Sequence, residues 1–211
     1  PAGARVGARE GACAPLIESC RAVSQRAAQT LKIAEDNNWL LDIAIDHLTL
    51  GRAALYKAIL ENSDLRLLTS DLSHTDAAVA GLRRAGQQDF IPRALLTRAW
   101  LRFLAGSRTG PESAQADLDE AWEIAERGPM KLFLADIHLH RARLFFREKE
   151  YPWNKNPDGS ARGPKDDLDA AEKIIQHETT YQRPDGTVIT ARYARRDEEL
   201  ADAWAAIRPA P

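Results

Sequence analysis

The residues best suited to chemistry in this chain are its five histidines and the carboxylates beside them. Asp136 and His140 are four residues apart, so on a helix both would reach one side and could bind the same metal ion. Asp46 and His47 occupy an earlier segment of similar pattern. His138 would project to a different side of the helix from His140, and no third ligand is close in sequence. A metal-dependent enzyme is therefore the most distant hypothesis, and we predict neither a metal nor a cofactor.

Nucleophilic catalysis has less support still. Cys13 and Cys20 have no neighbouring histidine, and on a helix they would stand about 10 Å apart, too far for a disulfide. They are typical of small buried thiols in a reducing compartment. Ser73 is followed by His74, but Ser73 or Thr75 is better explained as the cap of a helix. Neither a P-loop nor a glycine-rich dinucleotide fingerprint occurs, so we predict no nucleotide site and no catalytic residue.

Composition excludes several kinds of partner. The chain has 211 residues, 44% of them hydrophobic, with 29 Lys and Arg against 31 Asp and Glu, a formal charge of −2. Such a balance lacks the excess of positive charge that binding to nucleic acid or to an anionic membrane requires. No run of eighteen apolar residues occurs, which favours a cytoplasmic location. Met130 is the single methionine, so we expect that the chain is a piece of a longer protein.

The elements that would position these side chains are helices. Gly- and Ala-rich residues 1–14 predict a disordered or frayed tail. Beyond it, apolar residues recur at helical spacing, and Gly86 and Gly128 each predict a helix end with a left-handed turn. The carboxylates Asp117, Asp119, Glu120 and Glu123 are predicted to face water. The predicted helices are 15–35, 39–60, 73–85, 91–105, 112–127, 131–149, 166–177 and 196–207.

Two segments interrupt the helical pattern. Residues 151–165 are rich in turn formers and predict an insertion loop. Trp153 within it is either an exposed recognition knob or a plug folded back between helices, and we favour the plug. Two β-prone runs around Arg-Pro-Asp-Gly predict a small β-hairpin insertion near 179–190, so that 179–211 would be the hairpin and a C-terminal capping helix.

The helices themselves repeat as hairpins. When the first helices of three hairpins are superimposed, small residues coincide at Leu50-Gly51, Arg98-Ala99 and Arg141-Ala142. Four residues earlier, a buried type of position holds His47, Leu95 and His138. In the helix over 112–127, a small-large-small pattern is formed by Ala114, Leu118 and Ala121. On these residues the chain resembles the tetratricopeptide repeat family, with about three degenerate units over residues 15–178.

A second resemblance concerns context. The phrases LLDIAIDHLTLGRAALY, AVAGLRRAGQQDFIPRALLTRA, LADIHLHRARLFF and RRDEELADA are similar to the carboxy-terminal repeat region of large bacterial signalling NTPases of the STAND class. The family resemblance implies an all-α fold in which the hairpins stack into a right-handed superhelix. It also implies a non-catalytic module for protein interaction or sensing. A free-standing scaffold or a self-assembling adaptor is the alternative.

The resemblance further implies where a partner would bind, because the first helices of such an array line its inner surface. The partner would be a protein or peptide, or a second copy in a homo-oligomer. Trp100 and Phe103 have the alternative role of filling the interface within their hairpin. The inward positions carry the arginines and aromatics that commonly anchor proteins; they are Arg52, Arg93, Leu96, Trp100, Phe103, Asp136, Leu139, Arg143 and Phe146.

Overall fold

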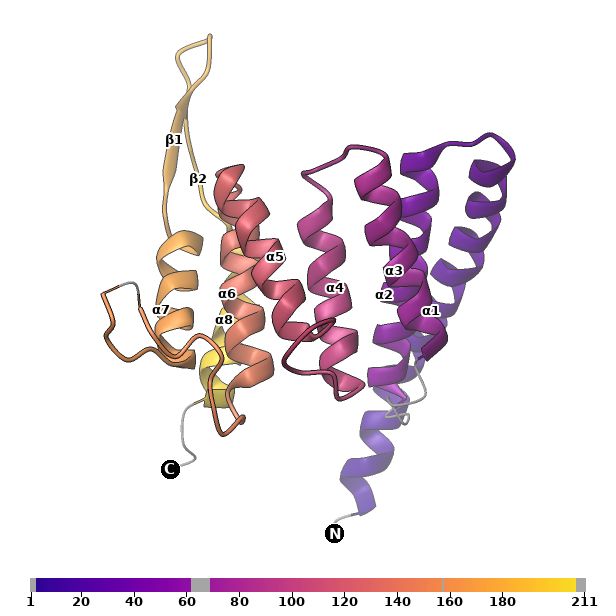
Figure 1. Ribbon diagram of the computed structural model, residues 1–211, viewed down its shortest axis with the longest axis horizontal. Coiled ribbons are helices and arrows are strands. Elements are labelled where there is room, and N and C mark those ends of the chain that lie inside the picture. The colour runs from indigo at the N-terminus through magenta and orange to yellow at the C-terminus, as the bar shows by residue number, and fades with distance from the viewer. Residues whose placement is uncertain (1–2, 62–68, 157, 208–211) are drawn as a thin grey trace. The chain divides into compact units, whose positions relative to one another are not determined.

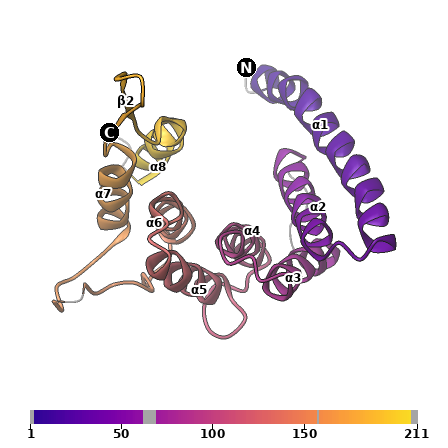
Figure 2. The ribbon, with the colours of Figure 1, turned by 90° about the horizontal axis from the view of Figure 1, so that it is seen from above.

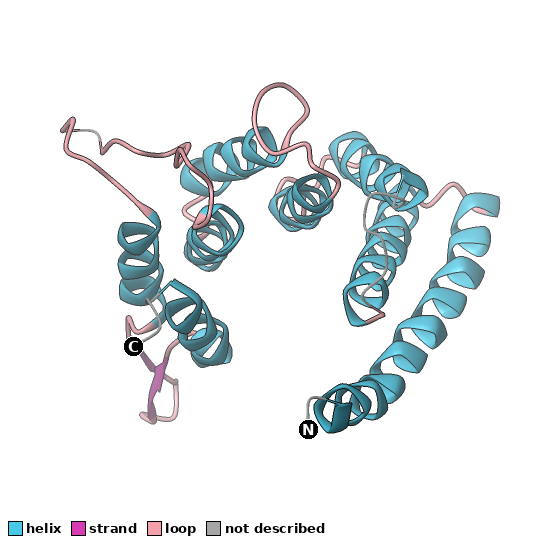
Figure 3. Ribbon diagram, turned by 90° about the horizontal axis from the view of Figure 1, so that it is seen from below, coloured by secondary structure: helices cyan, strands magenta, loops and turns pink. Residues whose placement is uncertain are grey.

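The computed structural model describes residues 3–61, 69–156 and 158–207. Within these ranges the chain is mostly helical, with eight α-helices and one antiparallel pair of strands (Figures 1 and 3). The helical class and the small β-hairpin are thereby confirmed. The elements in chain order are α1 Gly3–Asp36, α2 Leu40–Leu60, α3 Thr69–Arg84, α4 Ile91–Leu104, α5 Ala114–Arg127, α6 Lys131–Phe145, α7 Pro164–Ile175, β1 Thr179–Gln182, β2 Val188–Ala191, the 3-10 helix η2 Ala194–Arg196 and α8 Asp197–Ile207.

The chain divides into two compact units, residues 1–117 and 118–211, and the division falls inside α5. In the first unit, α1 to α4 pack in sequence order, and α2 also contacts α4 (Figure 2). Gly81 allows α3 to approach α2 closely, because a Cβ at this position would lie 2.8 Å from the Cβ of Ala44. Gly51 and Ala99 are both buried, as their small side chains predict.

The starts of two helices and the burial of two cysteines differ from the sequence-based expectations. Helix α1 begins at Gly3, so the backbone is helical where a tail was predicted, and Pro15 lies in its interior. The alanines and arginines before Pro15 are strong helix formers, which offsets the cost of the glycines. Helix α3 begins at Thr69, so Ser73 and Thr75 lie inside it and cap nothing. Cys13 and Cys20 are free thiols, as predicted, but half-buried instead of buried.

The predicted glycine stops have different causes. Gly86 has a φ of 71° just after α3, which is the left-handed turn that glycine accepts most easily. Gly128 follows α5 but is not among the residues with positive φ. A Cβ on Gly128 would instead lie 2.6 Å from Cε of Met130. Since Cε is the end of a flexible side chain, this contact does not by itself require glycine at position 128, and the predicted left-handed turn there was wrong.

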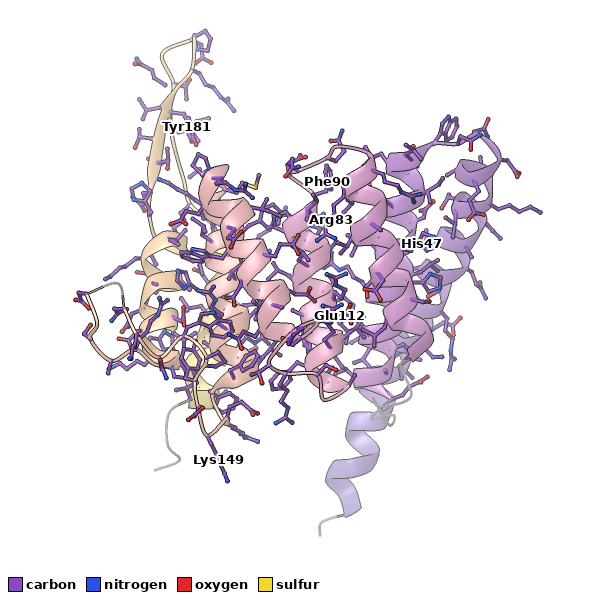
Figure 4. All side chains as sticks on the ribbon, viewed as in Figure 1. His47, Arg83, Phe90, Glu112, Lys149 and Tyr181 are labelled. Atoms are coloured by element: carbon purple, nitrogen blue, oxygen red, sulfur yellow. The ribbon has the colours of Figure 1, made fainter. Side chains whose placement is uncertain are left out.

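The second unit is built on α6, α7 and α8, and α6 contacts both of the other helices. Their shared core contains Ala142, which is fully buried as predicted, together with Ala135, Leu139, Leu168, Ala171, Ile175, Leu200 and Ala203. Strands β1 and β2 pair from Thr179↔Ala191 to Gln182↔Val188 and project away from α7, with Tyr181 exposed on the hairpin (Figures 1 and 4). Across the described helices of both units, none is long and apolar enough to cross a membrane.

Candidate functional site

A cluster of one arginine and two aromatic rings joins α2 and α4 in the first unit. Arg52 and Tyr56 are one helical turn apart on α2, and Nη2 of Arg52 donates to the Tyr56 hydroxyl over 3.2 Å. The Arg52 guanidinium carbon lies 5.9 Å from the centre of the Tyr56 ring. That ring in turn meets Trp100 of α4 edge-on, with 6.3 Å between ring centres. Tyr56 is 39% exposed, so the cluster forms part of the surface of this unit.

Helix α4 extends this surface upstream from Trp100. Arg93 lies seven residues before Trp100, hence on the same side of the helix, and its side chain is exposed. It makes no side-chain hydrogen bond or ion pair with the residues that the structure describes. Phe103, one turn beyond Trp100, is half-buried, with the Arg108 guanidinium 4.9 Å from its ring centre. We call Arg52, Tyr56, Arg93 and Trp100 the α2–α4 face.

Two predicted inward residues do not present their side chains. Leu96 of α4 is only 5% exposed and Leu139 of α6 only 1%, so both belong to the core and not to a contact surface. The reverse holds for Tyr56, which the sequence-based prediction missed. Its signal was present, since it stands four residues after Arg52 and aromatic-arginine pairs at this spacing share one side of a helix.

A network of ion pairs connects another side of α4 to neighbouring segments of the first unit. Arg98 donates to Asp117 at 2.7 to 3.2 Å and to Asp76 at 2.9 Å, and Arg102 donates to Asp117 at 3.0 Å. Burial lowers the pKa of Arg98, but the hydrogen bonds and attraction of Asp117 and Asp76 raise it overall. Ser113 caps α5 by accepting from the Ala116 amide over 3.2 Å. The prediction that Asp117 faces water was wrong. Asp117 is buried against Arg98 and Arg102, which belong to α4, and spacing along α5 alone could not indicate them.

In the second unit, the predicted partner-binding residues are engaged within the chain. The Asp136 carboxylate accepts from Nε and Nη2 of Arg196 at 2.6 and 3.0 Å, and it is 8% exposed. Glu199 accepts from the same arginine and lies 3.9 Å from Arg143. Phe146 is half-buried, 5.0 Å from the guanidinium of its neighbour Arg147. Because both carboxylate oxygens of Asp136 are bonded to Arg196, this side chain is not available to bind a partner.

The pairs considered for metal binding are not arranged as ligands. His140 donates from Nδ1 to the backbone carbonyl of Asp136 over 2.8 Å, while the Asp136 carboxylate is held by Arg196. Burial lowers the pKa of His140, which favours its neutral form. No group of three or more His, Cys, Asp or Glu placed to hold a metal occurs among the described residues.

His47 forms a different pair. Its Nδ1 lies 2.9 Å from Nδ1 of His74 on α3, so one ring must donate and the other accept (Figure 4 labels His47). Burial and the neighbouring His74 lower the pKa of His47. Asp46 instead accepts from the Thr30 hydroxyl at 2.9 Å. Asp46 and His47 thus have separate partners, and the partner of His47 is His74.

The structure reveals a buried polar network in the second unit that the sequence did not predict. Asp167, in the first turn of α7, is fully buried and bonds to His138 of α6 and to Tyr151 and Arg162 of the insertion loop. Burial raises the pKa of Asp167, but these three partners lower it overall. Burial and Asp167 raise the pKa of Tyr151. The loop over 151–163 is therefore tied to α6 and α7 by one carboxylate.

Two tryptophans enclose Arg141 beside this network. Its guanidinium lies 4.8 Å from the ring of Trp122 and 4.5 Å from that of Trp153. Trp153 donates from Nε1 to Asp119 over 2.6 Å and packs edge-on against Phe145. Trp153 is thus folded back as a plug, as predicted. The stacking of Trp153 and the bonds of Tyr151 and Arg162 to Asp167 attach this segment of turn formers to α6 and α7.

The chain was compared with protein-family models, with curated proteins and with solved structures, and none of these comparisons found a match.

Proposed function

We propose that this chain is a non-catalytic module of the tetratricopeptide-repeat kind, which binds a protein or peptide partner through the α2–α4 face. The observation that carries the proposal is the exposed Arg52–Tyr56–Trp100 cluster, which two helices build together. Tyrosine, tryptophan and arginine are the side chains that most often anchor protein interfaces, since each combines a large contact area with a polar group. Arg93 adds a cation that makes no bond to the described residues.

The packing order of the helices supports the repeat. In the first unit α2 contacts α3 and α4, and in the second unit α6 contacts α7 and α8. In each unit two consecutive helices form a hairpin, α2 with α3 and α6 with α7, and the first helix of the hairpin also contacts a helix that follows it. The three aligned small residues Gly51, Ala99 and Ala142 are all buried, as close approach of helices requires.

By resemblance, we propose as the wider setting the sensor end of a cytoplasmic bacterial signalling NTPase of the STAND class. A partner bound to the repeats would bias a nucleotide-binding domain elsewhere in the same protein. The gene tests this directly: an upstream reading frame that encodes a P-loop domain supports the setting, and a complete frame without one contradicts it.

The partner-binding proposal is tested by selecting a displayed library of random peptides on the whole chain. Peptides enriched on the wild type should bind the variants Tyr56→Ala and Trp100→Ala about tenfold or more weakly, as expected for anchor residues. Arg84→Glu, an exposed arginine on α3 outside this face, is the matched control and should bind as the wild type does. Equal binding by wild type and both alanine variants would remove the α2–α4 face from the proposal.

One observation favours the alternative of a self-assembling adaptor. Ile33, Trp39 and Leu40 near the α1–α2 turn are 53%, 52% and 47% exposed. Ile33 and Trp39 also line a depression of about 270 Å³. If this apolar patch joins copies, light scattering should show a dimer or larger species that Trp39→Lys converts to a monomer. A monomeric wild type at about 100 μM would contradict self-assembly at the affinity expected for an adaptor.

A further inference from the structure

The second unit contains an open groove of about 680 Å³ between α7 and α8, at the base of the β-hairpin. Its floor is apolar and comes from α8, where Leu200, Trp204 and the exposed Ala201 and Ala205 follow one another at helical spacing. The groove uses none of the residues of the α2–α4 face. It is large enough for the side chains of one helix or an equivalent ligand.

The rim of this groove is acidic. Glu172 and Glu178 stand on the α7 side, and neither forms an ion pair with a described residue. Asp197 is neutralised by Arg192, whose Nη1 lies 2.7 Å from its carboxylate. The last carbonyl groups of α7 add partial negative charge at the same end. The lining therefore carries three carboxylates against one arginine, which leaves the groove with a net negative charge above an apolar floor.

The first unit gives an example of two helices joined by opposite charges. There the arginines Arg98 and Arg102 of α4 bind Asp117 in the first turn of the following helix. The groove between α7 and α8 presents mainly carboxylates, where α4 presents arginines. A helix that complements the groove must accordingly carry cations, beside an apolar stripe that packs on Ala201, Trp204 and Ala205.

We propose that the α7–α8 groove binds a cationic amphipathic helix of a partner protein. Its apolar side chains pack on Ala201, Trp204 and Ala205, and its Lys or Arg residues pair with Glu172 and Glu178. The site is distinct from the α2–α4 face, so the module contacts its partners through two surfaces of different chemistry. The acidic rim selects against anionic helices, since like charges across an interface disfavour association.

The test uses the whole chain and three labelled helical peptides with the same leucine stripe, flanked by Lys, Gln or Glu. Fluorescence anisotropy should show the Lys peptide binding at least about tenfold more tightly than the Glu peptide, with an affinity that falls as salt rises. The double variant Glu172→Gln/Glu178→Gln should weaken binding of the Lys peptide about tenfold. Ala201→Trp should also abolish binding by filling the groove, while its melting temperature stays unchanged because Ala201 is exposed.

Asp202→Lys is the matched control, because Asp202 is exposed on α8 but does not line the groove. It should change the affinity for the Lys peptide less than about twofold. Three results would each overturn the proposal: no peptide of the set binds, the Glu peptide binds as well as the Lys peptide, or Asp202→Lys weakens binding as much as the double variant does. The last result would mean that only the net charge of the surface attracts the peptide.

Discussion

Buried carboxylates paired with arginine or histidine recur in this protein, and each one connects a helix to a segment that is distant in sequence. Asp117 binds Arg98 and Arg102, Asp136 binds Arg196, and Asp167 binds the insertion loop and α6. A buried carboxylate is costly unless every oxygen has a partner, so removing one member of such a group leaves an unpaired charge or donor.

Asp167→Asn should therefore destabilise the protein strongly. An amide cannot accept from His138, Tyr151 and Arg162 as a carboxylate does, so we expect a loss of about 3 kcal/mol in the free energy of unfolding. Urea denaturation of wild type and variant measures it. Asp169→Asn, on the same helix and half-buried, is the control and should change stability by less than about 0.5 kcal/mol. A loss as small as the control's would mean that the Asp167 network contributes no net stability.

The lowered pKa of Asp167 also predicts a dependence on pH. Because the folded value lies below that of the unfolded chain, the stabilisation is complete above the unfolded value of about 4. It is lost as the pH falls through the folded value. The stability difference between wild type and Asp167→Asn should accordingly shrink in acid.

His47 predicts a second dependence at milder pH. Its folded pKa lies below 6.5, so below that pH the unfolded chain binds more protons and the folded state loses stability as the pH falls. Between pH 7.5 and 5, the free energy of unfolding of His47→Gln should fall less than that of the wild type. Gln88→Ala, at an exposed residue that carries no titratable group, is the control and should leave the wild-type slope intact. Identical slopes for wild type and His47→Gln would exclude a contribution from the His47–His74 pair.

At the scale of elements, helix contacts depend on small residues and on the folded insertion loop. Gly81 and Ala44 bring α3 and α2 together, and Trp153 fixes the loop between α6 and α7. Neither contact can be replaced by a side chain of another size without moving a helix or freeing the loop.

Gly81→Val should separate α2 from α3. The new Cβ alone would lie 2.8 Å from the Cβ of Ala44, and valine adds two methyl groups to it. We expect a loss of about 1 to 3 kcal/mol in a thermal or urea unfolding experiment. Ala80→Val, at the neighbouring exposed position, reports the cost of valine in a helix alone and should be smaller. The prediction fails if the two variants melt together.

Trp153→Ala should free the insertion loop without unfolding the helices. The tryptophan supplies the stack on Arg141 and the bond to Asp119, so its loss should expose Lys155 to trypsin about tenfold faster than in the wild type. Mass spectrometry of the first fragments identifies the site. Trp39→Ala, at a 52% exposed tryptophan of the first unit, is the control. Unchanged cleavage at Lys155 would show that the plug does not hold the loop.

At the scale of the whole molecule, each of the two compact units has buried apolar residues of its own. The core of α6, α7 and α8 lies within residues 118–211, whereas Ala44, Leu55, Leu82 and Leu95 are buried within residues 1–117. Each unit therefore buries apolar surface of its own, which is the requirement for separate cooperative units.

Hydrogen exchange tests this division. In the full chain, Asp167→Asn should raise amide exchange in α6 and α7 by about tenfold or more, while exchange in α2 and α3 stays at the wild-type rate. Mass spectrometry of peptic peptides resolves the two regions. A parallel increase in α2 and α3 would show that the two units unfold as one.

The sequence by itself determined where the β-hairpin lies and which segments are helical, apart from the helical residues before Pro15 and the first turn of α3. These features depend on neighbours in the chain: apolar residues at helical spacing predicted α2 and α4 to within a residue at each end, and the two β-prone runs around Arg-Pro-Asp-Gly predicted the hairpin of β1 and β2. Small residues at Gly51, Ala99 and Ala142 likewise identified buried positions, because only their own size decides how near a helix can come.

Only the tertiary structure decided the partners of the polar side chains. Periodicity placed Asp117 on the polar side of its helix, but Arg98 and Arg102 from α4 bury it. The resemblance to the repeat family placed Asp136 on a surface open to a partner, whereas Arg196, sixty residues later, binds its carboxylate. The same long range of interaction brings Tyr56 to Trp100 and Asp167 to Tyr151. Spacing along one helix specifies a direction around its axis, and what lies in that direction is set by the packing of other helices.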